Sequence, residues 1–255
     1  MAIYISIVSH NHGKLISSLN LLPKLTKDFK VVVKNNFQDE TLVRFCKDNN
    51  ISLIDEPELY NIGFGENNNI VYDWCKRNLS LQDEDYFLVL NPDVMVDNDV
   101  ICELENFMSK YNHQLCSINL FTDKEYKVFD NSIRRFPNLF DFFSSFCLGI
   151  NNTIIDKALC NSPIKVDWAA GSFLMFSAKH YDRLNGFDKN YFMYCEDLDI
   201  CWRSAKFFNV KVVYCPMFKA IHFANHANRR MFSKHFIWHL KSVFRFLIRS
   251  ASHMK

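Results

Sequence analysis

The sequence predicts an α/β protein with a mostly parallel central sheet flanked by helices. Two observations lead to this fold class. Short apolar, β-branched runs alternate with helix-like stretches through the first 95 residues, as expected for parallel strands joined by crossover helices. These runs also end in polar clusters at 9–12, 34–36 and 91–93. Ligands of open α/β sheets bind at the carboxyl edge of the strands, so we expect a nucleotide-type site there.

Four strands and three helices are predicted in the first half. The predicted strands are 2–8, 29–33, 51–54 and 86–90. The predicted helices are one through Leu15, Leu19 and Leu22 that Pro23 closes, one over 40–49 and one over 68–78.

The second half is less regular. Its predicted elements are strands and turns over 115–135, a Phe-rich apolar segment at 136–150, a strand over 166–176, helices over 179–184 and 198–208, and a last strand at 210–214. No repeat, low-complexity stretch or flexible linker interrupts the chain, so we expect one compact unit.

Composition narrows the class of protein. A hydrophobic content of 49% and a charged content of 23% are those of a globular protein, and a net charge of +2 gives no case for nucleic-acid binding. Nine cysteines without C-x-x-C spacing and no apparent leader favour a reducing cytosol. No apolar run reaches the roughly 18 residues needed to span a bilayer.

Two motifs lie at the expected site edge. In Asn91-Pro92-Asp93 a carboxylate directly follows a buried strand, where it could hold Mg²⁺ or Mn²⁺ together with a diphosphate; an Asn-Pro turn with a solvated Asp is the plainer alternative. Segment 61–69 joins Gly63 and Gly65 to an amide-rich helix start. Such a segment suits phosphate or sugar hydroxyls, although ordinary loops use the same residues.

Segment 185–199 is the most informative stretch. It places Glu196, Asp197 and Asp199 within four positions after an aromatic run. Glu196 and Asp197 should point to different sides of a helix start, and a desolvated Asp there could serve as a general base. An acidic first turn that complements the helix dipole is the alternative. Asp199 and Arg203 have i,i+4 spacing and are interpreted as a structural pair.

Three further features carry weaker signals. The lone His222 is by itself more typical of a structural residue than of a ligand. The adjacent Arg134 and Arg135 suit a diphosphate or an ordinary surface equally. From Met231 to Ser250 the chain has helical period, with Phe232, Phe236, Leu240, Val243 and Leu247 on one side and Lys234, Lys241, Arg245 and Arg249 on the other. This pattern is typical of an interfacial membrane helix, or of a helix docked on the core.

Taken in order, these segments resemble a family-2 glycosyltransferase of the GT-A fold, nearest to bacterial rhamnosyltransferases of O-antigen and cell-wall linker assembly. The likeness rests on five segments: 7–11, 61–68, 90–93, 170–172 and 186–203. It implies three parts in a single domain: a nucleotide-sugar-binding half (1–120), an acceptor-binding half (121–228) and a basic amphipathic helix (229–255).

The resemblance also implies residue roles. Asp197 is implied as the general base, and Asp93 and His222 as ligands of Mn²⁺ or Mg²⁺. The implied donor-binding residues are Ser9, Asn11, Asn36, Gly63, Asn67, Asn91 and Asp93. The implied acceptor-binding residues are Arg134, Arg135, Gly171 and Glu196. Where the family usually has two carboxylates at the metal, this chain has Asn91 and Asp93.

The implied reaction is inverting transfer of L-rhamnose from dTDP-L-rhamnose to a GlcNAc-diphospho-polyprenol. We expect a cytoplasmic enzyme, peripheral at the inner face of the bacterial cytoplasmic membrane. Two other functions stay open. A nucleotidyltransferase would release pyrophosphate instead of a nucleoside diphosphate. A non-catalytic glycan- or lipid-binding relative would have no need of Asp93, Asp197 and His222.

Overall fold

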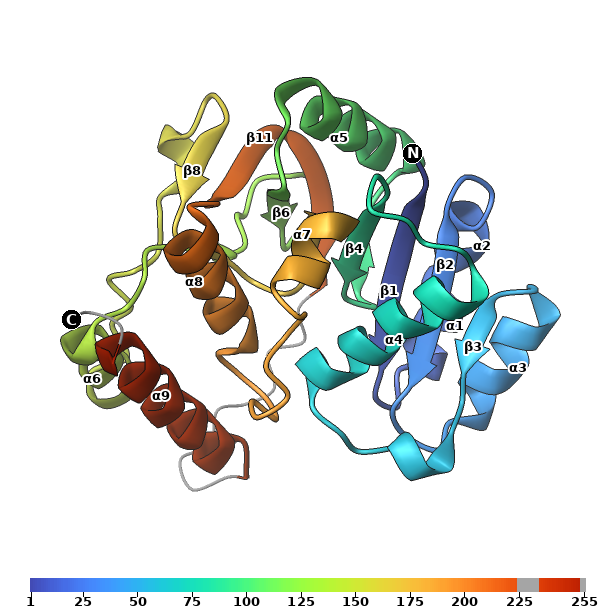
Figure 1. Cartoon of the computed structure of the whole chain (residues 1–255), viewed down its shortest axis with the longest axis horizontal. Helices are drawn as coiled ribbons and strands as arrows, with labels where there is room; N and C mark the ends of the chain where they lie inside the picture. The colour runs from blue at the N-terminus through green and yellow to red at the C-terminus, as the bar shows by residue number, and fades with distance from the viewer. Residues whose placement is uncertain (224–233, 253–255) are drawn as a thin grey trace.

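The computed structural model describes residues 1–223 and 234–252. Within these residues a nine-stranded sheet forms the centre of the molecule (Figure 1). In spatial order its strands are β3 (Ser52–Ile54), β2 (Lys30–Asn35), β1 (Ile3–Ser9), β4 (Tyr86–Leu90), β10 (Phe173–Ser177), β6 (Leu115–Phe121), β11 (Val212–His222) and β5 (Val94–Met95), with β8 (Ile164–Val166) paired to β11. A separate two-stranded sheet joins β7 (Ile133–Arg134) to β9 (Trp168–Ala169).

The predicted parallel sheet is confirmed. Strands β3, β2, β1 and β4 run parallel to one another, so the carboxyl ends of β1, β2 and β4 share one edge. The second half contributes mixed pairing, because β10 is antiparallel to both β4 and β6, whereas β6 and β11 are parallel.

Helices cover both faces of the sheet. Successive side chains of a strand point to opposite faces, and β1 accordingly sends Ile5 into one core and Tyr4 into the other. The first core is closed by α1 (Gly13–Leu19), α3 (Glu40–Asp48) and α5 (Asn98–Tyr111). The second is closed by α4 (Phe64–Asn78), α7 (Ala178–Arg183) and α8 (Glu196–Phe208).

Several predicted boundaries were wrong. The helix expected to end at Pro23 ends at Leu19, because Asn20 is left-handed (φ 48°), and Pro23 lies in the first turn of a second helix, α2 (Leu22–Leu25). Proline is tolerated at a helix start, where its missing N–H has no intrahelical partner anyway. The helix expected from 68 begins at Phe64.

Two predicted strands also differ. The strand expected over 166–176 is broken into β8, β9 and β10. The strand expected over 210–214 is β11, which runs on to His222, so the histidine ends a strand instead of following it. The Phe-rich segment forms α6 (Leu139–Cys147).

The C-terminal helix, expected from Met231, is described from Lys234 as α9 (Lys234–Ser252), and Phe232 lies outside the described residues. One side of α9 is docked: Val243 and Phe246 are buried in a cluster with Tyr191 and Trp202. Leu240, expected on the same apolar side, is 37% exposed. The predicted docking on the core is therefore confirmed for one strip of the helix, and Leu240 lies on a second strip that is partly exposed.

The expected basic face needs one correction. Arg249 is not a free surface cation, because its guanidinium bonds Asp188 and the fully buried Asp199, each at 2.9 Å. Lys241 and Arg245 are exposed, as predicted. None of the described helices is long and apolar enough to cross a membrane.

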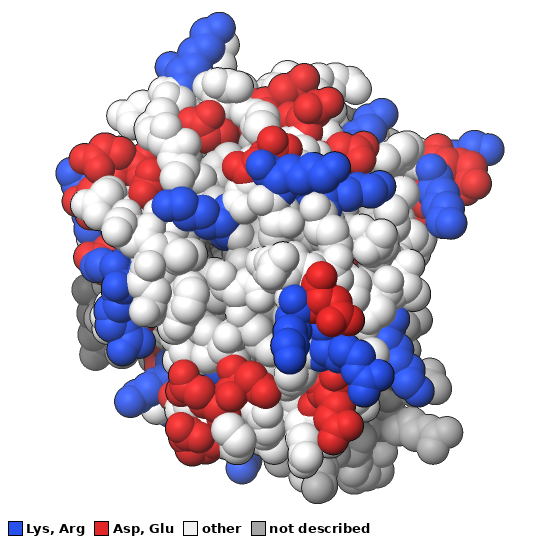
Figure 2. Space-filling model, turned by 90° about the vertical axis from the view of Figure 1, so that its right-hand side faces the viewer, with Lys and Arg blue, Asp and Glu red and all other residues white. Residues whose placement is uncertain are grey.

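Charge is mixed over the side of the molecule that carries α3 and β3. Figure 2 shows basic and acidic side chains intermingled there, with broad neutral areas between them. Neither the basic nor the acidic side chains form a continuous patch on this face.

Candidate active site

Three strand ends meet as the sequence predicted. The backbone N–H of Asn36 donates to the Ser9 carbonyl (2.8 Å), and Asn91, after β4, donates its N–H to the Ser172 carbonyl (3.0 Å). Ser9 is buried and its hydroxyl accepts a bond from the His12 N–H. Asn11 lies in the turn that follows, with a left-handed φ of 62°.

The amides predicted to bind the donor also shape the adjacent loop. Asn36 bonds both backbone groups of Ile62, accepting from its N–H at 3.1 Å and donating to its carbonyl at 3.0 Å. Asn67 is fully buried and donates to the carbonyls of Ile62 and Gly63. Its Oδ1 has no hydrogen-bond partner among the described residues. That oxygen is therefore a buried acceptor without a partner in the described structure.

Gly63 has a packing explanation. A Cβ built at this position would lie 2.8 Å from the Phe192 carbonyl oxygen and 2.9 Å from that of Tyr191. The Phe64 N–H also donates to the Phe192 carbonyl at 3.2 Å. The glycine thus lets the loop before α4 lie directly against the loop before α8, which brings the two halves of the sequence together at the site.

Asp93 and His222 face each other, although they are 129 positions apart in the sequence. The distance from Asp93 Oδ1 to His222 Nε2 is 3.4 Å, because β11 pairs with β5 next to the end of β4. The other ring nitrogen, Nδ1, is 2.5 Å from Asp130 Oδ2. Asp130 was missed by the sequence analysis, since it lies in an irregular segment without a recognisable motif.

This arrangement fits a divalent cation. Histidine ligands of metals usually bond a carboxylate through their second ring nitrogen, as His222 does through Asp130. Burial lowers the pKa of His222, but the hydrogen bonds and charges of Asp130 and Asp93 outweigh it and raise that pKa to about 9. A cation that binds the ring would have to displace the proton that it carries at neutral pH. The described residues contain no group of three or more His, Cys, Asp or Glu side chains that would hold a metal unaided. Oxygens of a bound diphosphate would have to complete the shell.

A pocket of about 380 Å³ adjoins this group and is lined by His222, Asn91, Gly171, Glu196 and Asp197, among others. Asp197 lies on its wall, where Oδ2 accepts from the Gly171 N–H (3.1 Å) and Oδ1 from the Leu198 N–H (2.8 Å). Burial raises the pKa of Asp197, and these two bonds act in the opposite direction. The two bonds fix the orientation of the Asp197 carboxylate at the N-terminus of α8.

Glu196 shares the pocket with Asp197. Burial and the neighbouring charge of Asp197 raise the pKa of Glu196, and its Oε2 has no partner among the described residues. We infer that a proton held by the pair resides on Glu196, because Asp197 receives two N–H bonds. The preceding residues Tyr194 and Cys195 both have left-handed φ angles (70° and 62°). Such backbone strain in non-glycine residues is typical of functional sites.

The side chains of the adjacent Arg134 and Arg135 lie in different places. Arg134 lines the pocket and its guanidinium stacks 5.2 Å from the Trp168 ring centroid. Arg135 is exposed and donates to the Asn152 carbonyl at 2.6 Å, away from the pocket lining. Arg134 is the last residue of β7 and Arg135 follows the strand.

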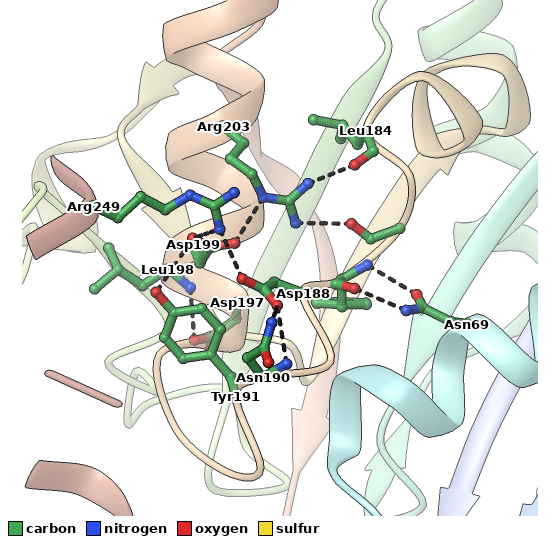
Figure 3. Close-up of polar contacts among 12 residues, drawn as sticks. Asn69, Leu184, Asp188, Asn190, Tyr191, Asp197, Leu198, Asp199, Arg203 and Arg249 are labelled. Atoms are coloured by element: carbon green, nitrogen blue, oxygen red, sulfur yellow. Dashed lines mark hydrogen bonds and ion pairs between the residues drawn. The ribbon is translucent and has the colours of Figure 1, made fainter. Parts of the chain in front are cut away.

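Behind the pocket, a polar network supports α8. The predicted Asp199–Arg203 pair is confirmed at 2.7 Å and is buried. Arg203 also donates to the carbonyls of Leu184 and Gly186, and Arg249 reaches Asp199 from α9 (Figure 3). These bonds anchor the segment that carries Glu196 and Asp197.

Comparison with known proteins assigns the family. No protein-family model matches the chain. The chain is 41% identical over 250 residues to the rhamnosyltransferase WbbL of Escherichia coli (strain K12), covering 97% of this chain and 93% of that protein. The chain belongs to this glycosyltransferase family. It is also 29% identical over 171 residues to the N-acetylglucosaminyl-diphospho-decaprenol L-rhamnosyltransferase of Mycobacterium tuberculosis (strain CDC 1551 / Oshkosh), covering 64% of this chain and 55% of that protein.

Solved structures confirm the GT-A fold of the glycosyltransferase. A crystal structure of GalNAc-T7 with UDP, GalNAc and Mn²⁺ matches 96% of this chain and 47% of its own, with a TM-score of 0.66 and 14% identity. A crystal structure of S. aureus TarS 1-349 in complex with UDP matches 85% of this chain and 60% of its own, with a TM-score of 0.53 and 15% identity. At these identities the likeness concerns the fold alone.

Proposed function

We propose that this glycosyltransferase transfers L-rhamnose from dTDP-L-rhamnose to a GlcNAc-diphospho-polyprenol, with inversion at the anomeric carbon. The observation that carries the proposal is the 41% identity to the rhamnosyltransferase WbbL over nearly the whole chain. The name of the mycobacterial relative supports the acceptor class, because it specifies a GlcNAc-diphospho-lipid.

In the proposed mechanism Asp197 takes the proton from an acceptor hydroxyl, which then attacks the anomeric carbon on the side opposite the nucleotide. The two backbone bonds at 3.1 and 2.8 Å hold the carboxylate in a fixed orientation, as general-base catalysis requires. Glu196, Gly171 and the Arg134 guanidinium would contact the acceptor. Arg135 lies outside the pocket lining, so we give it no contact with the substrate.

On the donor side, Asp93 and His222 would hold Mn²⁺ or Mg²⁺, with Asp130 orienting the histidine. A bound divalent cation would offset the charge of the departing diphosphate. Ser9, Asn11, Asn36 and Asn91 would surround the nucleotide at the shared strand edge. Asn67 would contribute its buried Oδ1.

We further propose the inner face of the cytoplasmic membrane as the place of action, because a polyprenyl acceptor is confined to the bilayer. Lys241 and Arg245 are exposed on α9, where cations would attract anionic lipid headgroups. Residues 1–120 are proposed as the donor half and residues 121–228 as the acceptor half.

The test uses a panel of nucleotide sugars with GlcNAc-diphospho-undecaprenol, monitored by release of nucleoside diphosphate. Asp197→Asn should leave donor binding nearly intact and lower turnover by at least about 10²-fold, the low end for loss of a general base. Asp182→Asn, a change at the exposed ion pair with Lys76, serves as the control. Release of pyrophosphate would identify a nucleotidyltransferase. Donor affinity that falls as far as turnover in Asp197→Asn would make Asp197 a binding or structural residue.

A further inference from the structure

An apolar groove runs between α6 and α9, next to the pocket of Asp197. We call it the α6–α9 groove and define it by Leu139, Phe143, Leu240, Phe244 and Ile248. It has a volume of about 650 Å³, and every side chain that lines it is apolar. Figure 1 shows the two helices side by side at one end of the molecule.

The groove consists of large side chains left in contact with water. Leu139 is 70% exposed, Phe244 68% and Ile248 67%. Leu240, Phe244 and Ile248 are spaced four residues apart and form a second apolar strip along α9, beside the strip of Val243 and Phe246 that is buried in the core. Because the core and the Arg249 ion pairs already hold the helix in place, folding of the described chain leaves this second strip uncovered.

The groove is continuous with the pocket. Phe142 lines both cavities, and its ring packs against Phe246 with centroids 6.4 Å apart. Two consecutive residues of α9 face the two cavities: His239 lines the pocket and Leu240 lines the groove. A molecule with a polar end at Asp197 and an apolar end could therefore extend over Phe142 from one cavity into the other.

We infer that the α6–α9 groove binds the first isoprenoid units of the acceptor's lipid chain. The inference rests on the proposed function, which supplies a sugar diphosphate joined to a polyprenyl chain. The pocket offers carboxylates for sugar hydroxyls and the Arg134 guanidinium for a diphosphate. The groove is lined by apolar side chains alone. The two cavities thus present, side by side, the two chemistries that such an acceptor combines.

A flat bilayer is the competing occupant of this face. The isoprenoid chain of the acceptor is the favoured occupant, because the groove is concave and opens beside Glu196 and Asp197. Contact with a flat bilayer would not need this shape. The volume of the groove is also within the range of ligand-binding cavities, roughly 300–1,000 Å³.

The experiment compares two acceptors with the same GlcNAc-diphosphate headgroup, one esterified to undecaprenol and one to ethanol, which has no isoprenoid unit, in detergent micelles. The variant is Leu139→Ser combined with Phe244→Ser. The matched control is Leu159→Ser, because Leu159 is 78% exposed but lines neither cavity. The readout is kcat/KM of each protein for each acceptor.

The groove variant should lose about tenfold or more in kcat/KM for the undecaprenyl acceptor, since each buried CH₂ group contributes roughly 0.8 kcal/mol. Its kcat should change little, its kcat/KM for the ethyl acceptor should match that of the wild type within about twofold, and Leu159→Ser should match the wild type on both acceptors.

Equal losses on both acceptors would overturn the inference and leave the proposed function standing. The inference would also be overturned if the groove variant no longer bound acceptor-free vesicles but kept the wild-type ratio of kcat/KM between the two acceptors. That result would assign the exposed side of α6 and α9 to the bilayer. Failure of the wild type to glycosylate either acceptor would instead refute the proposed function, and the inference with it.

Discussion

Replacing Arg249 by Met tests how α9 is held on the molecule. The Arg249 guanidinium bonds Asp188 and Asp199 at 2.9 Å each, and Asp199 is fully buried. A hydrogen bond to a charged group contributes about 1.5–3 kcal/mol. The Arg249 side chain is 31% exposed, and Asp199 keeps its 2.7 Å bond to Arg203. We therefore expect a loss of about 2 kcal/mol in the free energy of unfolding, below the 3–5 kcal/mol seen when a buried charge loses its partner.

The measurement is thermal unfolding followed by circular dichroism. For a chain of this size, a change of 1 kcal/mol shifts the Tm by about 2–4 °C, so the Arg249→Met variant should melt about 4–8 °C below the wild type. Arg245→Met is the control, because Arg245 is exposed on the same helix one turn earlier. Equal Tm values for the two variants would show that the ion pairs of Arg249 do not dock the helix.

Three further outcomes are expected. Asp93→Ala should abolish transfer and weaken the Mn²⁺-dependent binding of dTDP in calorimetry, and full wild-type activity in excess chelator would refute the metal assignment. Asp130→Asn should lower Mn²⁺ affinity by about 10–100-fold, because His222 loses the carboxylate that orients it; an unaltered Mn²⁺ titration would contradict this role. Changing Lys241 and Arg245 together to Gln should weaken binding to anionic vesicles by about 2 kcal/mol, or about 30-fold. Unchanged sedimentation of that double variant would show that these cations do not face the membrane.

The fold was largely predictable, because strand alternation and polar strand ends are local properties of the sequence. Ser9, Asn36 and Asn91 were expected to converge, since parallel strands align their carboxyl ends, and they do. The boundaries at Pro23 and Phe64 were missed because proline can lie in the first turn of a helix as well as follow its end, and glycine can be an N-cap residue as well as end a helix. In both cases the surrounding packing decides which occurs.

Contacts between distant segments were harder to foresee. Asp130 meets His222 only because β11 continues past its predicted end to the edge of β5, and no local pattern marks that extension. Arg249 has the same sequence periodicity as the exposed Arg245. Its buried partner Asp199 lies 50 positions earlier in the chain, so hydrophobic periodicity alone could not distinguish the two arginines.

The register of β11 has a consequence for how this enzyme tolerates insertions and deletions. The strand pairs regularly with β6 as far as Cys215 and resumes at Lys219, so residues 216–218 bulge out of the ladder. Beyond the bulge, Ile221 and His222 pair with β5. A strand shifted by one residue turns every side chain to the opposite face. Loss or gain of a single residue after the bulge would therefore point residue 222 away from Asp93, whereas length changes inside the bulge could be absorbed there. Related chains should accordingly vary in length at 216–217, outside the buried core residue Phe218, and keep a constant spacing from Lys219 to His222.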